Sequence, residues 1–225
     1  MINSKITSIG EILFDIYPTY KRIGGAPFNF IYHIWKFTGK GSQISKIGRD
    51  NYGTEILTFL NKTGFDISAI QIDDKHPTGT VNVELDDNKI PSFVISPDTV
   101  HDNNALNKII MDDFNHQTDL LYFGTLAQRN RISRNIIQSL WGKDKKYFCD
   151  VNLRQKFYSK ELIQSCLTNS DVVKLNYDEL KLIAEFENHC ENNLEDSAKR
   201  LATKHGIEGA LPNNDKIYYK YLERM

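Results

Sequence analysis

The chain has 225 residues, a net charge of −1 and a pI near 6.6, so it lacks the basic excess of an electrostatic nucleic-acid binder. Hydrophobic residues (40%) and charged residues (25%) indicate a globular protein with a sizeable core, without a run of the ~20 apolar residues that cross a bilayer. Cys149, Cys166 and Cys190 form no Cys-x-x-Cys pair, and the first ten residues lack an apolar signal-peptide core. These features predict a cytoplasmic protein with reduced thiols and no zinc site.

The first 64 residues predict alternating strands and helices. Residues 5–17 are rich in Ile and predict one strand, or two strands interrupted at Gly10. Apolar residues at helical spacing over 28–37, just after Pro27, predict a helix that begins at this proline. A short strand follows in "SQISKIG", and residues 50–63 predict a helix that ends at Gly64.

The pattern changes between residues 65 and 95, where no helical period occurs. In "TVNVEL", Val81 and Val83 alternate with Asn82 and Glu84, which is typical of a sheet with one solvated face. The Asp-Asp-Asn-Lys sequence at 86–89 predicts a hairpin turn. We therefore expect a small β layer, formed mainly by about 14–24 and 66–96, inserted into a single α/β domain that spans 1–225.

The second half returns to strand–helix alternation. "DLLYFGTL", "YFCDVNL" and "DVVKLN" predict buried strands, and helices are expected over 131–141, 159–169, 177–187 and 194–205. This order predicts a mostly parallel, Rossmann-type sheet flanked by helices. Such sheets bind ligands beyond the carboxyl ends of their strands. The polar or small residues at the predicted strand ends are Asp15, Gly124, Asp150, Asn152 and Asn176.

Six segments carry a resemblance to a known family: "GGAPFNFIYHI", "SKIGRDNYG", "HPTGTVNVEL", "FGTLAQR", "CDVNLR" and "KLNYDEL". In this order they resemble the ribokinase-like (PfkB) carbohydrate kinases, most closely the fructokinase-type members, from Ile6 to His205. The resemblance implies a ribokinase-like core with a small β-sheet lid that closes over the sugar and allows a homodimer. It also implies phosphorylation of fructose, or of ribose, a nucleoside or 2-keto-3-deoxygluconate, with ATP and Mg²⁺.

The front of the chain matches the family's sugar site. Asp15 corresponds to a carboxylate that accepts hydrogen bonds from two sugar hydroxyls, although a turn or cap role is the alternative. Gly24 and Gly25 let the backbone approach a ligand and adopt positive φ at little cost. The amide of Asn29 both donates and accepts, which suits a hydroxyl group. His33 is expected to be a core or surface histidine instead of a ligand contact.

Three further positions are candidate sugar contacts. Asn82, like Glu84, either touches the sugar or is simply solvated. Phe93 either covers the apolar face of the sugar or belongs to the core. Gly124, at the end of a predicted strand, allows close approach of the backbone to the ligand.

"CDVNLR" predicts a cluster at one strand end. Asp150, Asn152 and Arg154 occupy alternating positions and so lie on one face. The guanidinium of Arg154 presents planar donors to a sugar hydroxyl or a phosphate. A structural salt bridge between Arg154 and Asp150 is the alternative.

"KLNYDEL" matches the family's Asn-x-x-Glu motif at Asn176 and Glu179. The resemblance implies that these residues tune Mg²⁺ and phosphate binding, with Glu179 acting on the metal through water, which suits an ion that dehydrates reluctantly. Lys174 is expected near the nucleotide phosphates. Alternatively, Asn176 is a helix N-cap and Glu179 a favourable first-turn acid.

The family's late Gly-Ala-Gly-Asp loop, which supplies the catalytic base, has no counterpart in the sequence, and neither has the adenine pocket. No catalytic residue is therefore predicted. "GIEGAL" leaves almost no room for a strand after the helix at 194–205, as though residues were missing. Either the natural product ends here and is inactive, or the sequence lacks residues of a longer protein; an intact mass well above 26.0 kDa would exclude the first explanation.

Two functions from different classes follow. The first is an ATP-dependent sugar kinase of fructokinase type. The second is a catalytically incomplete module that still binds a sugar. A dehydrogenase is disfavoured, because no Gly-x-Gly-x-x-Gly follows the first strand.

Overall fold

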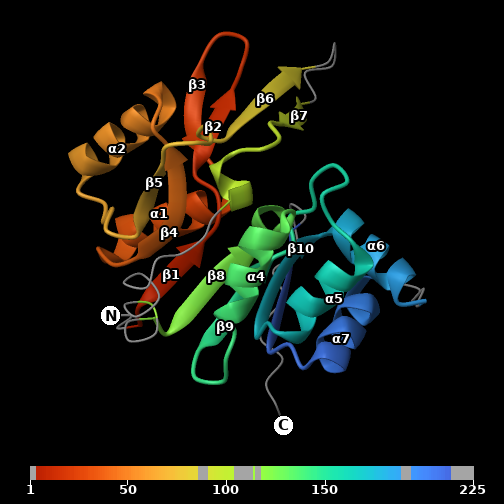
Figure 1. Cartoon of the computed structure of the whole chain (residues 1–225). Helices are drawn as coiled ribbons and strands as arrows, with labels where there is room; N and C mark the ends of the chain where they lie inside the picture. Colours follow the sequence, from red (N-terminus) through yellow and green to blue (C-terminus); the bar gives the residue numbers. More distant parts are fainter. Residues whose placement is uncertain (1–3, 86–90, 104–113, 115–117, 189–193, 214–225) are drawn as a thin grey trace.

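The computed structural model describes residues 4–85, 91–103, 114, 118–188 and 194–213. Its larger sheet, here the core sheet, has seven strands in the order β11-β10-β9-β8-β1-β4-β5, and every pair is parallel. The strands are β1 (Ile6–Ile9), β4 (Ser42–Gly48), β5 (Ile70–Asp73), β8 (Leu120–Gly124), β9 (Lys146–Asp150), β10 (Val172–Asn176) and β11 (Gly209–Asn213). The predicted α/β class with a mostly parallel sheet is confirmed (Figure 1).

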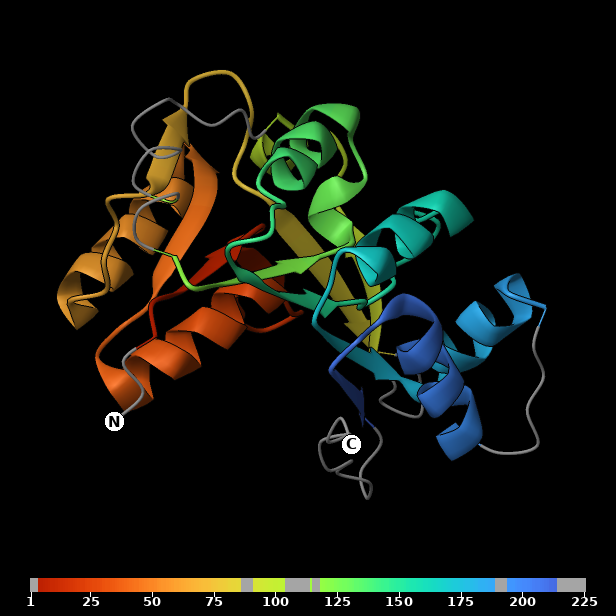
Figure 2. The ribbon, with the colours of Figure 1, turned by 90° about the horizontal axis from the view of Figure 1, so that it is seen from below.

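Helices cover both faces of the core sheet. They are α1 (Ala26–Thr38), α2 (Asn51–Thr63), α4 (Arg131–Ser139), α5 (Lys160–Thr168), α6 (Tyr177–Phe186) and α7 (Leu194–His205), with 3₁₀ turns η1 (Val100–Asn103) and η2 (Leu126–Gln128). Figure 2 shows α1 on one face and α4 and α5 on the other. Each predicted helix is present, and its boundaries shift by three residues at most.

Local signals explain the ends of the first two helices. Pro27 lies in the first turn of α1, where its missing N–H costs no helical hydrogen bond. Asp50 accepts a hydrogen bond from the amide of Gly53 at the start of α2, and Gly64 ends that helix in the left-handed conformation with φ of 80°. The predicted start at Pro27 and stop at Gly64 are therefore confirmed.

The smaller sheet, here the lid sheet, rises above the carboxyl ends of the core strands (Figure 1). It consists of β2 (Leu13–Ile16), β3 (Lys21–Gly24), β6 (Thr80–Leu85) and β7 (Pro91–Ile95) in the order β3-β2-β6-β7. The β2/β3 and β6/β7 pairs are antiparallel, and β2/β6 is parallel. The predicted turn at 86–89 lies outside the described residues.

Two expectations about strands are wrong. The predicted lid segment 66–96 includes β5, but β5 pairs in parallel with β4 and so belongs to the core sheet. Its crossover through α2 returns the chain beside β4, a non-local outcome that a short apolar run does not reveal. The expected lack of a strand after α7 is also wrong, because residues 209–213 form β11 in parallel with β10.

The centre of the core lies under β8. Leu121 and Phe123 of this strand are buried on one face of the sheet, and Tyr122 between them is buried on the other face against Phe30 of α1, as expected for a parallel strand that is covered on both sides. On the α1 and α2 face, Phe28, Ile31 and Leu60 pack into a second buried cluster. None of the described helices is long and apolar enough to cross a membrane.

Phe123→Ala should destabilise the fold by about 3–5 kcal/mol, because a large cavity would open in the centre of the core. The free energy of unfolding in urea measures this loss. Ile132→Ala, whose side chain is 47% exposed on α4, is the matched control and should change stability by about 0.5 kcal/mol or less. Equal losses for the two variants would contradict the assignment of β8 as the central strand.

Candidate functional site

A cleft of about 590 Å³ lies where the lid sheet meets α1 and the carboxyl ends of the core strands. This is the edge at which parallel sheets bind ligands. The predicted site residues that line it are Asp15, Gly25, Asn29, Phe93, Asp150, Asn152, Arg154 and Lys174. The structure therefore brings together residues from the lid sheet, the start of α1 and two core strands.

Asp15 reaches the cleft from the lid sheet. It lies in β2, beside Arg22 of β3, with 3.3 Å between Arg22 Nε and Asp15 Oδ2. Of the two alternatives for residues 5–17, the one with two strands is observed: the first core strand ends at Ile9, and a separate strand, β2, carries Asp15 near its end. Gly24 does not line the cleft, yet a Cβ there would lie 2.5 Å from Asp15 Oδ2. Gly24 leaves the space that the Asp15 carboxylate occupies.

The start of α1 forms a second wall. Gly25 has φ of 106°, a conformation that favours glycine, and Asn29 is exposed one turn into the helix. His33 is exposed, in agreement with the expected surface histidine, and from its position one turn later it also lines the cleft. Phe30 stacks on Tyr122 of β8 with ring centroids 4.1 Å apart, which anchors α1 against the core sheet.

Asp150 is the buried charge at the sheet end of the cleft. Its carboxylate accepts a hydrogen bond from the Tyr122 hydroxyl at 2.6 Å and two from Lys174 Nζ at 2.8 and 2.9 Å. Burial, and then the Asp150 carboxylate, raise the pKa of Tyr122 well above its usual value, so the phenol stays a donor. The charge partner of Asp150 is therefore Lys174, and the alternative pairing with Arg154 is not formed.

The loop after β9 crosses from the core toward the lid. Asn152 has a left-handed backbone with φ of 37°, which Asn tolerates better than most residues. The Arg154 guanidinium lies 5.2 Å from the ring centroid of Phe93 on β7, a cation–π contact between this loop and the lid sheet. Phe93 thus closes one side of the cleft and is only partly buried.

Asn176 and Glu179 form a capping box at the start of α6. Asn176 Oδ1 accepts from the Glu179 amide at 2.9 Å, and Glu179 Oε2 accepts from the Asn176 amide at 2.8 Å. Glu179 Oε1 also accepts from the amide of Leu153 at 2.8 Å. The helix-cap alternative is thus realised, and the same carboxylate holds the loop that carries Asn152 and Arg154.

The capping box does not reach the cleft itself. Burial raises the pKa of Glu179, although the backbone hydrogen bonds from Asn176 and Leu153 oppose this. Neither Asn176 nor Glu179 lines the cavity. Among the described residues no group of three or more His, Cys, Asp or Glu side chains could hold a metal ion. Direct binding of Mg²⁺ by these residues alone does not fit this geometry.

Two other predicted contacts lie away from the cleft. Asn82 is exposed on the face of β6 opposite to Val81, which lines the cavity, and this arrangement favours the solvated alternative. Gly124 is buried at the end of β8, and its carbonyl accepts a hydrogen bond from Gln128. Alternation along β6 puts Val81 and Asn82 on opposite faces, and the sequence pattern does not say which face meets the ligand.

Sequence reasoning missed Glu11, Arg22 and Tyr122, all of which line the cleft. Glu11 follows the first core strand, where the strand-end rule points, but one of the two alternatives for residues 5–17 places it inside a single long strand. Tyr122 is a typical buried strand residue, and only its neighbour Asp150 distinguishes it from the core. Arg22 is a charged residue in a short strand that has no sequence signal of its own.

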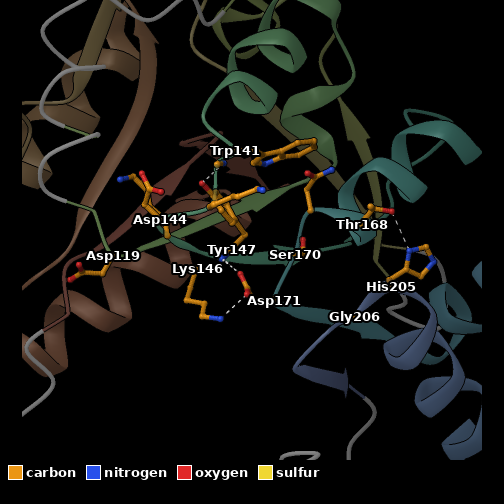
Figure 3. A pocket seen from close by; sticks show the side chains of 14 residues that line it. Asp119, Trp141, Asp144, Lys146, Tyr147, Thr168, Ser170, Asp171, His205 and Gly206 are labelled. Carbon is orange, nitrogen blue, oxygen red and sulfur yellow. Dashed lines mark hydrogen bonds and ion pairs between the residues drawn. The ribbon is translucent and has the colours of Figure 1, made fainter. Parts of the chain in front are cut away.

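A second groove, of about 460 Å³, lies near the amino ends of β9 and β10 (Figure 3). Lys146 there pairs with Asp171 at 2.8 Å and with Glu208 at 2.9 Å, and His205 lies 3.3 Å from the Thr168 hydroxyl. These charges satisfy one another, and the groove lies opposite the strand ends that bind ligands in parallel sheets. The cleft under the lid sheet is therefore the candidate site.

The fold and the cleft define a class before any relative is considered: a parallel α/β core with a small sheet over its carboxyl edge is the ribokinase-like kinase fold. Residues 4–215 match the model of the pfkB family carbohydrate kinases. The chain belongs to the PfkB family.

Individual relatives agree with this assignment. The chain is 28% identical over 201 residues to the uncharacterized sugar kinase PH1459 of Pyrococcus horikoshii, covering 80% of this chain and 64% of the relative. It is 27% identical over 205 residues to a fructokinase of Escherichia coli, with 81% and 64% covered. The chain thus spans 64% of the length of these curated relatives.

Solved structures show the same fold. A fructokinase of Xylella fastidiosa with bound ATP superposes with a TM-score of 0.80 at 17% identity, covering 94% of this chain and 68% of that one. PH1459 in complex with ATP has a TM-score of 0.71 at 25% identity, with 82% and 67% covered.

Glu179→Ala should lower the free energy of unfolding by about 1–3 kcal/mol, because the partly buried backbone hydrogen bonds from Leu153 and Asn176 would lose their acceptor. Chemical denaturation monitored by circular dichroism measures the change. Asp178→Ala, an exposed first-turn neighbour, is the matched control and should cost about 0.5 kcal/mol. If the control costs as much, Glu179 does not hold the β9 loop.

Proposed function

We propose that this chain forms the sugar-binding part of a fructokinase-type kinase, which transfers the γ-phosphate of MgATP to a hydroxyl group of a small sugar, most favourably fructose. The observation that carries the proposal is the 590 Å³ cleft, in which acceptors, donors and apolar surface converge from the lid sheet, α1 and the core sheet. Family membership supports the reaction class, and the fructokinase relatives support the sugar.

The lining of the cleft suits a polyhydroxylated ligand. Asp15 only accepts hydrogen bonds, Arg154 only donates, and the amides of Asn29 and Asn152 do both, so each sugar hydroxyl finds a complementary partner. Phe93 offers an apolar surface to the C–H face of the sugar. With the lid sheet over the ligand, water that would otherwise hydrolyse ATP is excluded.

Fewer residues are proposed to act on the nucleotide than on the sugar. Lys174 lies at the cleft and carries a positive charge toward the phosphates, while Asp150 holds it in place. Glu179 has one oxygen on each of two backbone amides, so its proposed contact with Mg²⁺ is through water. In this proposal Mg²⁺ arrives with the phosphates of ATP.

No described residue is proposed as the catalytic base. In the family, an aspartate in a late Gly-Ala-Gly-Asp loop has that role, and the sequence does not contain this string. The chain spans 64% of the length of its curated relatives, and we assign no base within it. A cytoplasmic location and a homodimer through the lid sheet stay predictions; buried, unpaired Cys149 and Cys166 are consistent with a reducing compartment.

The second candidate is a sugar-binding module without catalysis. It is favoured by the completeness of the sugar side of the cleft in a chain without a recognisable base. The two candidates differ in turnover, and they share the binding site.

Asp15→Asn should weaken fructose binding about tenfold or more, because an amide cannot accept hydrogen bonds from two hydroxyls with both of its polar atoms. Isothermal titration calorimetry measures the affinity, with Asp178→Asn on the exposed side of α6 as control. Unchanged binding in Asp15→Asn would remove Asp15 from the sugar site.

The full-length protein should release ADP from MgATP only when a sugar is added, and fructose should be the best of fructose, ribose, adenosine and 2-keto-3-deoxygluconate. A coupled assay for ADP measures this. Sugar binding without ADP release favours the binding module, and the absence of both refutes the kinase proposal.

A further inference from the structure

The polypeptide passes between the core sheet and the lid sheet four times. The passages lie before β2, after β3, before β6 and after β7. A small internal cavity lies where they meet, lined by Glu11, Leu13, Gly79, Thr80, Ile95 and Ser96 from three of the passages, together with His101 and Arg129. We name Glu11, His101, Asp102 and Arg129 the root cluster, because they lie at the root of the lid sheet.

Arg129 ties the end of β7 to the core. Its guanidinium donates two hydrogen bonds to the Asp102 carboxylate, both 2.6 Å long, and one to the carbonyl of Ser96 at 2.9 Å. Asp102 in turn accepts from the amide of Thr99 at 3.0 Å. This ion pair is nearly buried, with side chains 9% and 7% exposed, so it is well shielded from water.

His101 packs against the passage before β6. A Cβ at Gly79 would lie 2.7 Å from His101 Nε2, so the glycine allows the imidazole to approach the backbone. Burial lowers the pKa of His101 to about 4; Asp102 and a hydrogen bond with the backbone of Ile12 oppose this effect and Arg129 adds to it, so the ring is neutral at pH 7. It can donate with one nitrogen and accept with the other.

Glu11 supports the passage after β3. A Cβ at Gly25 would lie 2.4 Å from the Glu11 carbonyl oxygen and 3.2 Å from Glu11 Cγ. Gly25 occupies the N-cap position of α1 and has no side chain to accept the free amides of the first turn. The carboxyl group of Glu11 accepts a backbone hydrogen bond from Ala26, and so takes the part of a cap from elsewhere in the chain.

The root cluster has hydrogen-bonding capacity that the protein does not use. Among the described residues, the buried atoms Glu11 Oε2 and Arg129 Nη1 make no hydrogen bond, and the His101 imidazole has only the backbone of Ile12 as a partner for one of its two nitrogens. Buried polar groups are normally satisfied by protein or by ordered water. The accessible volume of the cavity between them, about 10 Å³, is close to that of one water molecule.

We propose that Glu11 is a positioning residue of the sugar site. It holds the start of α1 in place, and through a water shared with His101 and Arg129 it connects the floor of the cleft to the root of the lid sheet. Glu11 lines both the cleft and the small cavity, whereas His101 and Arg129 line only the latter. The inference rests on the proposed sugar-binding function. It adds to the proposed sugar site a residue that acts indirectly, through its contacts with the backbone of Gly25 and Ala26.

This arrangement couples sugar binding to one proton. Burial raises the pKa of Glu11 to about 7, with backbone hydrogen bonds from Glu11 and Ala26 opposing and the Asp150 charge adding to it. Arg129 opposes the shift, and the other charged or titratable groups that line the cleft or belong to the root cluster are Tyr122, Lys174, His101, Asp102, Asp15, Arg22, His33 and Arg154. A sugar in the cleft displaces the water that screens Asp150 from Glu11, so Glu11 binds its proton more tightly.

Calorimetry with fructose at pH 7, in two buffers of different ionisation enthalpy, should show net proton uptake on binding. Wild-type affinity should fall severalfold between pH 6 and pH 8, because binding favours the protonated carboxyl.

Glu11→Gln keeps an acceptor for the Ala26 amide, so it should bind within about threefold of wild type at pH 6 and lose most of the pH dependence. Glu11→Leu should bind about tenfold more weakly at both pH values. Glu187→Gln, far from the cleft, is the matched control and should keep the wild-type profile.

A stability measurement tests the root cluster without sugar. Because the folded pKa of Glu11 exceeds its unfolded value of 4.5, its contribution is fully present below pH 4.5 and is lost as pH rises through about 7. Glu11→Gln should therefore gain stability relative to wild type as the pH rises over this window. If the variant does not fold, ¹³C NMR of the glutamate carboxyl groups in the wild type should show one that titrates near pH 7.

The outcomes separate the two proposals. Fructose binding without proton uptake, or with an unaltered pH profile in Glu11→Gln, overturns the role of Glu11 and leaves the sugar-binding proposal intact. No fructose binding by wild type overturns the proposed function. In that case the proposed role of the root cluster is refuted if the dependence of stability on pH is the same in Glu11→Gln as in the wild type, or if no glutamate titrates near pH 7.

Discussion

β1 lies between β4 and β8, and parallel pairing on both sides aligns the carboxyl ends of all three strands at one edge of the core sheet. Because β9 and β10 continue the same alignment, the loops that follow all five strands lie along the same edge of the sheet. The Asp150 carboxylate, the Tyr122 hydroxyl and the Lys174 ammonium meet there although 52 residues separate the first and last of them along the chain. Every other feature of the cleft is positioned relative to this edge.

The two walls of the cleft are held in different ways. On the core side, the capping box of α6 anchors the loop after β9 through Glu179 and Leu153, so the segment that carries Asn152 is set by backbone hydrogen bonds. On the lid side, Asp15 depends on a neighbouring glycine that leaves room for its carboxylate. Backbone hydrogen bonds hold the loop after β9 directly, whereas the position of Asp15 depends on where the lid sheet lies relative to the core sheet. For this reason our proposal concerns the contacts at the root of the lid sheet.

Much of the fold could be predicted because its signals are local. Helical spacing, Pro27, Asp50 and Gly64 determine where the first two helices begin and end, and these contacts lie within a few residues of one another. Strand partners are not local: a short apolar segment such as β5 or β11 pairs equally well with several edges until the crossover is made. For the same reason the sequence did not reveal that His33 faces the cleft and Asn82 faces solvent.

The sequence by itself determined the class of fold, the order of the strands and helices as far as α7, and a family resemblance that the match over residues 4–215 supports. Only the tertiary structure decided that Asp150 pairs with Lys174, that Glu179 holds the amide of Leu153, and that Glu11 lies beneath Gly25. The physical reason is distance along the chain. Propensity, capping and periodicity act over a single turn or strand, whereas the partner of a buried charge is set by which strands the sheet brings together.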